Sequence, residues 1–117
     1  MSLKKKLTMC SVLPVIAISA TDLQAKDIQG TSGNDLLQGT SSADSIIGWA
    51  GDDTIWGYAG ADTIKGSPGR DYLLGNNGTD KLYGQADADT ILGGNGTDTA
   101  SGGSGSDTCD AETEWSC

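Results

Sequence analysis

The chain has 117 residues and a formal net charge of −9 at pH 7, with 18 glycines, no phenylalanine and no histidine. Only 36% of the residues are apolar, which excludes a large conventional hydrophobic core and leaves room for one domain. So acidic a chain is a poor partner for nucleic acid and a good one for cations. High glycine with high charge is typical of disorder, unless the sequence repeats with a fixed period.

Residues 1–25 have the layout of a secretory signal peptide. Lys4, Lys5 and Lys6 form a basic start, a mostly apolar run follows, and small residues end it at Ala20 and Ala25. The run is short for a membrane anchor, which is the alternative. We expect export to the extracellular space or the periplasm after cleavage, which we place at Ala25 rather than Ala20. The mature chain then has four basic and fifteen acidic residues, a net charge of −11, and no transmembrane span.

From Gly30 to Asp110 the chain is nine nonapeptides in register, without insertion. They read GTSGNDLLQ, GTSSADSII, GWAGDDTIW, GYAGADTIK, GSPGRDYLL, GNNGTDKLY, GQADADTIL, GGNGTDTAS and GGSGSDTCD, and we call them units 1 to 9 with places one to nine. Place one is always glycine: Gly30, Gly39, Gly48, Gly57, Gly66, Gly75, Gly84, Gly93 and Gly102. Place six is always aspartate: Asp35, Asp44, Asp53, Asp62, Asp71, Asp80, Asp89, Asp98 and Asp107.

The other places predict how each unit folds. Glycine at places one and four favours positive φ and close approach of other groups. At place four Asp87 is compatible with positive φ, whereas Ser42 is not readily explained. Place eight is aliphatic in seven units and shrinks to Ala100 and Cys109 in the last two. Each unit is therefore predicted to be a six-residue turn and a three-residue strand whose place-eight side chain points inward, and only stacking can bury that row.

Stacking places the aspartates of place six above one another. Two unit charges about 4 Å apart repel by ~4 kcal/mol at an effective dielectric of about 20, so a divalent cation is needed between them. The turns offer carboxylate and carbonyl oxygens but no histidine and no thiolate. This donor set favours a hard cation, and calcium accepts irregular cages of oxygen better than magnesium does.

The units resemble the RTX, or hemolysin-type, calcium-binding nonapeptide with the pattern G-G-x-G-x-D-x-U-x. The resemblance covers Gly30 to Asp110, although place two departs from the family's glycine in seven units, including Trp49 and Tyr58. It implies an all-β fold: a right-handed parallel β-roll, a solenoid with two nonapeptides per turn and about 4.5 turns in nine units. It also implies that place-six aspartates of units two apart hold each ion together with turn carbonyls, the place-one glycines among them.

Applied to this chain, the resemblance gives two columns of aspartates. The odd column is Asp35, Asp53, Asp71, Asp89 and Asp107, and the even column is Asp44, Asp62, Asp80 and Asp98. Slots between successive members set a ceiling of about seven calcium ions, with doubtful slots beside Ser42 and Asp87. Because each bound ion adds to stability, we expect a chain that is disordered without calcium and folds outside the cytoplasm.

The roll is expected over residues 26–110 and a C-terminal cap over 111–117. At the start, Ile28 fits place eight of an incomplete unit, but Lys26 occupies place six, so no ion is expected there. Cys109 and Cys117 form an even pair in an exported chain, which favours a disulfide over two free thiols or a zinc site. The bridge would fold the cap under the last turn, where Trp115 could cover the base.

One outer face of the predicted roll is apolar. The odd units present Leu36, Trp56, Tyr72, Leu74 and Leu92 on it. We interpret this face as a candidate surface for self-association or a protein partner. The alternative is a scatter of exposed apolar residues.

These features predict a calcium-binding module with a structural or adhesive role outside the cell. The chain has no zinc-binding helix motif, no nucleophile elbow and no room for a catalytic domain, so we do not expect an enzyme. Two alternatives stay open: a fragment or accessory of a larger secreted toxin or enzyme, and an ice-binding roll. Ice binding is disfavoured because place five carries no regular threonine ladder.

Overall fold

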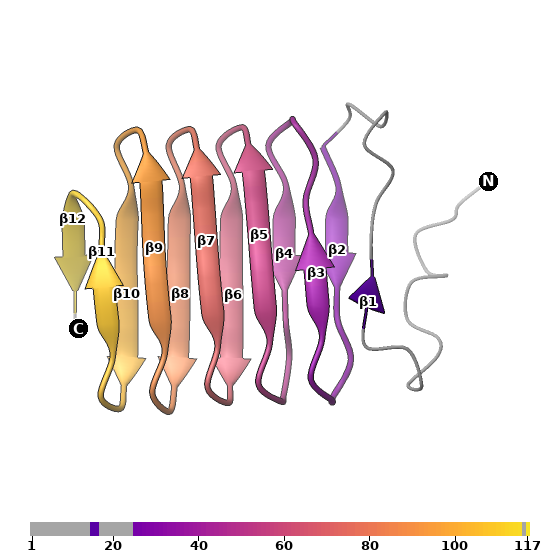
Figure 1. The fold of residues 1–117 in the computed structure, drawn as a ribbon, viewed down its shortest axis with the longest axis vertical. Coiled ribbons are helices and arrows are strands. Elements are labelled where there is room, and N and C mark those ends of the chain that lie inside the picture. Colours follow the sequence, from indigo (N-terminus) through magenta and orange to yellow (C-terminus); the bar gives the residue numbers. More distant parts are fainter. Residues whose placement is uncertain (1–14, 17–24, 116) are drawn as a thin grey trace.

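A computed structural model describes residues 15–16, 25–115 and 117 (Figure 1). Most of the predicted signal peptide lies outside these residues, and its cleavage stays a prediction. Two of its residues form the short strand β1 (Val15–Ile16), which pairs in parallel with β3. Among the described residues, no helix is long and apolar enough to cross a membrane.

The strands alternate between two parallel sheets. One sheet has the order β1-β3-β5-β7-β9-β11 and the other the order β12-β10-β8-β6-β4-β2. The remaining bounds are β2 (Asp27–Gln29), β3 (Leu36–Gln38), β4 (Ser45–Ile47), β5 (Thr54–Ala59), β6 (Thr63–Pro68), β7 (Tyr72–Asn77), β8 (Lys81–Ala86), β9 (Thr90–Asn95), β10 (Thr99–Ser104), β11 (Thr108–Asp110) and β12 (Thr113–Trp115). Consecutive strands lie in different sheets, so two nonapeptides make one turn. The predicted parallel β-roll is confirmed, with about five turns.

The core is a double row of place-eight side chains between the two sheets. Leu37, Ile55 and Leu73 are register partners in one sheet, and Ile46 and Ile64 in the other. The fully buried members are Ile28, Leu37, Ile46, Ile55, Ile64, Leu73, Leu82, Ile91 and Ala100. The inward direction of place eight is therefore confirmed, including Ile28 of the incomplete first unit. Burying each large aliphatic side chain contributes roughly 1.5–3 kcal/mol, but each strand supplies only one.

The strands β5 to β10 are longer than predicted. Each has six residues and includes places one to three of the following unit. In β5 and β7 the ladder continues as Tyr58 opposite Asn76 and Ala59 opposite Asn77. The predicted six-residue turn is thus wrong for these units. Positive φ at place two redirects the backbone at each corner, so that places two and three rejoin the ladder.

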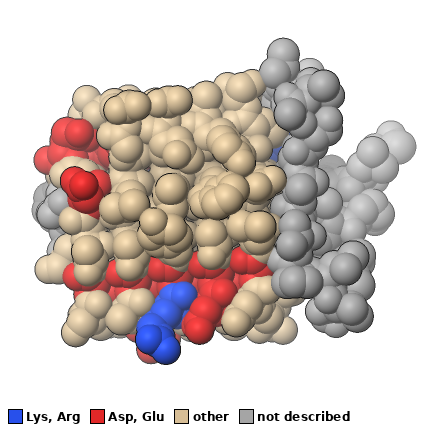
Figure 2. Space-filling view, viewed as in Figure 1, with Lys and Arg blue, Asp and Glu red and all other residues tan. Residues whose placement is uncertain are grey.

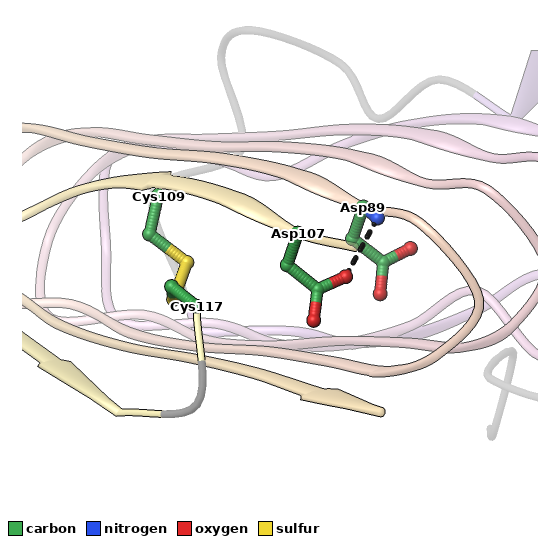
Figure 3. The surroundings of a disulfide bond; sticks show 4 residues. All are labelled: Asp89, Asp107, Cys109 and Cys117. Carbon is green, nitrogen blue, oxygen red and sulfur yellow. Dashed lines mark hydrogen bonds between the residues drawn. A yellow bond between two sulfur atoms is a disulfide. The ribbon is translucent and has the colours of Figure 1, made fainter. Parts of the chain in front are cut away.

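A disulfide and a short strand lie at the C-terminal end of the roll, and the predicted cap over 111–117 stays a prediction. The predicted disulfide between Cys109 and Cys117 is present, with the two Cα atoms 5.9 Å apart (Figure 3). Within the bridged segment, Ala111 packs against the core. β12 then pairs with β10 and extends that sheet by one strand, opposite Thr99 to Ser101. The predicted position of the Trp115 side chain lies outside what the structure describes.

The predicted apolar face lies on the outside of the sheet that contains β3, β5, β7 and β9. The register places Trp56 beside Leu74 and Leu74 beside Leu92. Tyr72 is 41% exposed, whereas Leu36 and the other three are half-buried. Self-association through this face stays a prediction.

Candidate metal centre

Each place-six aspartate is the residue immediately before a strand. Asp53, Asp71 and Asp89 precede β5, β7 and β9 in one sheet, and Asp62 and Asp80 precede β6 and β8 in the other. The strands of the two sheets run in opposite directions, so the odd column follows one edge of the roll and the even column the opposite edge (Figure 1). Figure 2 shows an acidic band along one of these edges, and most of the outer face above the band is uncharged.

Within each column the aspartates are joined by a ladder of hydrogen bonds. The backbone N–H of each place-six aspartate from Asp35 to Asp89 donates to Oδ1 of the aspartate two units later, for example Asp35 to Asp53 at 2.8 Å and Asp89 to Asp107 at 2.9 Å (Figure 3). Lys26 begins the even ladder by donating its N–H to Asp44 Oδ1 at 2.8 Å. The predicted columns are therefore brought together, and the ladder uses at most one oxygen of each carboxylate.

That second oxygen, Oδ2, is turned toward the place-one glycine of its own unit. A Cβ added at any of the nine place-one glycines would lie no more than 2.7 Å from it. None of these glycines has positive φ, so that part of the prediction is wrong for place one. Glycine is needed there because the carboxylate occupies the space of a side chain.

Carbonyl oxygens enter the same space from the next unit of the column. The position that a Cβ of Gly30 would take lies 2.5 Å from Asp35 Oδ2 and 2.7 Å from the carbonyl oxygen of Gly48. Gly39 has the same surroundings, with Asp44 Oδ2 at 2.7 Å and the carbonyl oxygen of Gly57 at 2.5 Å. A carboxylate of one unit and the place-one carbonyl of the next unit in its column thus approach the same glycine, and their role as ligands stays a prediction.

The nine turns are of two kinds, which differ at places two and four. In units 3 to 9 both places have positive φ, and we call these the open turns. Their place-two residues are Trp49, Tyr58, Ser67, Asn76, Gln85, Gly94 and Gly103. In units 1 and 2 neither place has positive φ, and place two is Thr31 or Thr40. We call these two the threonine turns.

In the open turns the inward carboxylate oxygens have no hydrogen-bond partner. Oδ2 is buried and accepts no hydrogen bond from any residue that the structure describes in Asp53, Asp62, Asp71, Asp80, Asp89, Asp98 and Asp107. Asp80 and Asp98 have no exposed surface at all. A buried, unpaired carboxylate oxygen costs several kcal/mol, so each open turn is incomplete without a positive partner.

In the threonine turns the same oxygen is bonded within the turn. The Thr31 N–H donates to Asp35 Oδ2 at 2.5 Å, and the Thr31 hydroxyl lies 3.0 Å from both carboxylate oxygens. Thr40 bonds Asp44 in the same way, at 2.6 Å from N–H and 3.1 Å from the hydroxyl. Each hydroxyl also accepts the place-four N–H, from Gly33 or Ser42, at 3.1 Å.

This difference accounts for the two exceptions at place four. Ser42 stands in a threonine turn, where place four has no positive φ and donates its N–H to the threonine. Asp87 stands in an open turn with φ of 77°. Its Oδ2 also accepts the N–H of Gly69 at 3.0 Å, so this side chain links two turns of the odd column.

Burial disfavours the charged form of the aspartates in the middle of the columns. It raises the pKa of Asp53, Asp62 and Asp89 from 3.8 to about 7. It raises the pKa of Asp71 and Asp80 to about 6. Nearby carboxylates add to the rise, and the backbone N–H bonds of the ladder oppose it. Without a cation, Asp53, Asp62 and Asp89 would therefore be partly protonated near neutral pH.

The odd column has a further set of polar groups at place five. The Asn34 side chain accepts the Asp52 N–H at 2.8 Å, and the Asp52 side chain accepts the Arg70 N–H at 2.9 Å. Beside them an open hollow of about 460 Å³ is lined by Asp53, Asp71 and other residues of the edge. Asp52 lies near enough to raise the pKa of both these aspartates.

The residues present fit a hard cation. In the described part of the chain, no three acidic, histidine or cysteine side chains gather at one point. An ion between turns would therefore take carboxylates from its column and complete its shell with backbone carbonyls. Calcium accepts about six to eight such oxygens at roughly 2.3–2.6 Å in irregular arrangements.

Two sets of hydrogen bonds to the aspartate columns were not predicted from the sequence: those of the place-two threonines and that of Glu112. The threonines were visible, because place two is threonine in units 1 and 2 and in no other unit. The second is Glu112, whose Oε1 accepts the Asp98 N–H at 2.7 Å, where the rest of the column uses an aspartate. Glu112 follows Asp98 by 14 residues instead of 18, so it falls outside the nonapeptide register.

Comparison with known proteins agrees with this geometry. Searches of curated proteins and of solved structures returned no significant match. A family model described as the RTX calcium-binding nonapeptide repeat (4 copies) matches residues 29–64, 56–91 and 74–109. Repeats of this family bind calcium and form a structural module rather than a catalytic one. With most of its length matched and its turns stacked in a parallel roll, the chain belongs to the RTX calcium-binding nonapeptide repeat family.

Proposed function

We propose that this protein binds several calcium ions between its stacked turns and folds only when they are bound. The observation that carries the proposal is the set of seven buried Oδ2 atoms without a hydrogen-bond partner among the described residues. The place-one carbonyl oxygens of Gly66, Gly75 and Gly93 enter the same space as Oδ2 of Asp53, Asp62 and Asp80, which gives an ion a mixed carboxylate and carbonyl shell.

The energies make calcium decisive for folding. Each ion bound at ten times its dissociation constant contributes about 1.4 kcal/mol. Five ions would contribute about 7 kcal/mol, which is comparable to the whole stability of a small domain. Without ions, the thin core faces buried carboxylates whose charged form is disfavoured. The same carboxylates become favourable ligands once calcium neutralises them.

We further propose that folding takes place outside the cytoplasm, where the roll serves as a structural module. The features of residues 1–25 support export, and the disulfide of the cap supports an oxidising compartment. The cytoplasm keeps free calcium low, so the chain would stay unfolded until export. An adhesive role and a partner for the outer face stay predictions.

Circular dichroism of the purified protein tests this function. We expect a disordered spectrum in chelator and a β-rich spectrum in millimolar calcium. With magnesium in place of calcium, the spectrum should stay close to the one in chelator. Asp80→Asn is the matched variant, because an amide can still accept the Asp62 N–H but does not carry the charge. It should need more calcium to fold. A β-rich spectrum that is the same in chelator and in calcium would contradict the proposal.

A further inference from the structure

We infer that the two threonine turns close without an ion, so that the calcium sites begin at Asp53 and Asp62. This inference rests on the proposed function and specifies which turns carry it out. In each threonine turn, the place-two N–H and hydroxyl occupy the carboxylate oxygens that are free in the open turns.

The bonding of Asp35 leaves its carboxylate little capacity for a cation. Its Oδ2 accepts both the N–H and the hydroxyl of Thr31, and the hydroxyl is itself fixed by the Gly33 N–H. An ion bound to this oxygen would have to displace these bonds, whereas an ion at Asp53 Oδ2 would displace none from a described residue. Asp44 is more constrained, because its Oδ1 also accepts the Lys26 N–H.

The backbone conformation of the threonine turns also differs from that of the open turns. Places two and four have positive φ in all seven open turns and in neither threonine turn. The backbone conformation at places two and four therefore differs between the two kinds of turn, as the bonding of the carboxylate does.

The inference lowers the expected number of ions. A slot needs a free carboxylate on both sides, which removes the slot between Asp35 and Asp53 and the slot between Asp44 and Asp62. Three slots remain in the odd column and two in the even column, five in all. The threonine turns then act as an ion-free cap at the start of the roll, as the disulfide-bridged segment does at its end.

The test compares the two ends of the odd column. Asp35 and Asp107 are terminal members, so each borders one slot, but only Asp107 has a free Oδ2. Calcium bound per chain is counted by equilibrium dialysis and metal analysis for the purified protein, Asp35→Asn and Asp107→Asn. Circular dichroism at the same calcium concentration verifies that each variant is folded.

We expect Asp35→Asn to keep all the calcium ions of the unmodified protein and Asp107→Asn to bind one fewer. Loss of an ion from Asp35→Asn would overturn the inference while leaving the proposed function intact. If Asp107→Asn keeps every ion, the free Oδ2 of an open turn is not a ligand and the inference falls, whereas the proposed function falls only if the unmodified protein binds no calcium. The even column repeats the test with Asp44→Asn and Asp98→Asn, should an odd-column variant fail to fold.

Discussion

The threonine turns and the open turns share one motif but complete their carboxylates in different ways. In the threonine turns, Thr31 and Thr40 supply the donors themselves. In the open turns, glycine or a residue with positive φ stands at place two, and Oδ2 has no donor among the described residues. We infer from this difference that the aspartate alone does not define a calcium site. On this inference, the donors of the neighbouring place-two residue decide whether the turn needs an ion.

The largest expected effect is the difference in stability between glycine-to-alanine variants at place four of an open turn and of a threonine turn. Gly78 has φ of 132°, and a Cβ there would collide with the backbone of Gly60. Gly33 has no positive φ, and its nearest new neighbour would be the Thr31 hydroxyl oxygen at 3.7 Å. We expect Gly78→Ala to lower the unfolding free energy in calcium by about 3 kcal/mol or more, and Gly33→Ala by less than about 1 kcal/mol.

Urea denaturation in saturating calcium measures both glycine variants. Equal losses of stability would mean that the turns have the same backbone conformation and would break the comparison.

A second effect follows from the raised pKa values of the place-six aspartates in units 3 to 7. A raised folded-state pKa destabilises the metal-free roll above about pH 7, and this penalty is relieved as pH falls from about 7 toward 3.8. In chelator, the β content should therefore rise as pH is lowered from 8 to 5, values that bracket these pKa values. In calcium the pH dependence reverses, so the β content should fall as pH is lowered, because protons compete with the ion for the same carboxylates.

Calcium titrations followed by circular dichroism at several pH values test this effect. Below these pKa values, the apparent affinity of the protein for calcium should fall about tenfold per pH unit for each proton that the ion displaces. A calcium midpoint that does not move between pH 8 and pH 5 would show that these carboxylates are not the ligands.

The smallest effect has opposite signs in the two kinds of turn. Thr40→Gly removes a hydroxyl that bonds a buried carboxylate, so it should lower stability in calcium by about 1–2 kcal/mol. Gln85→Gly relieves a φ of 86° in an exposed residue, so it should raise stability by about 0.5–1 kcal/mol. Thermal unfolding of the two variants beside the parent chain shows the signs. If both variants changed stability in the same direction, place two would not have different roles in the two kinds of turn.

The sequence was sufficient for features that depend on its period. Strict registration of place eight predicted the buried row from Ile28 to Ala100, and the spacing of place six predicted both columns. The disulfide followed from the even number of cysteines in the expected mature chain. Such features depend only on stacking identical units, which a one-dimensional pattern specifies.

The sequence did not predict features that depend on where one side chain points or which group it bonds. The role of place-one glycine depends on where the carboxylate turns, which is a rotamer and not a pattern. Thr31 differs from the family's glycine in the same formal way as Trp49, yet only Thr31 donates to its aspartate. Glu112 acts in a cap with its own spacing. In each case the direction or the bonding of one side chain decides the outcome, and the repeat pattern does not specify it.

The most direct test of the account is the number of calcium ions bound by the folded chain at saturation. Native mass spectrometry of the disulfide-bonded protein resolves this number one ion at a time. The account predicts five, one for each pair of free carboxylates in the two columns. Seven ions, the ceiling for nine equivalent turns, would contradict the distinction between threonine turns and open turns. A folded chain without bound calcium would contradict the role of the ion itself.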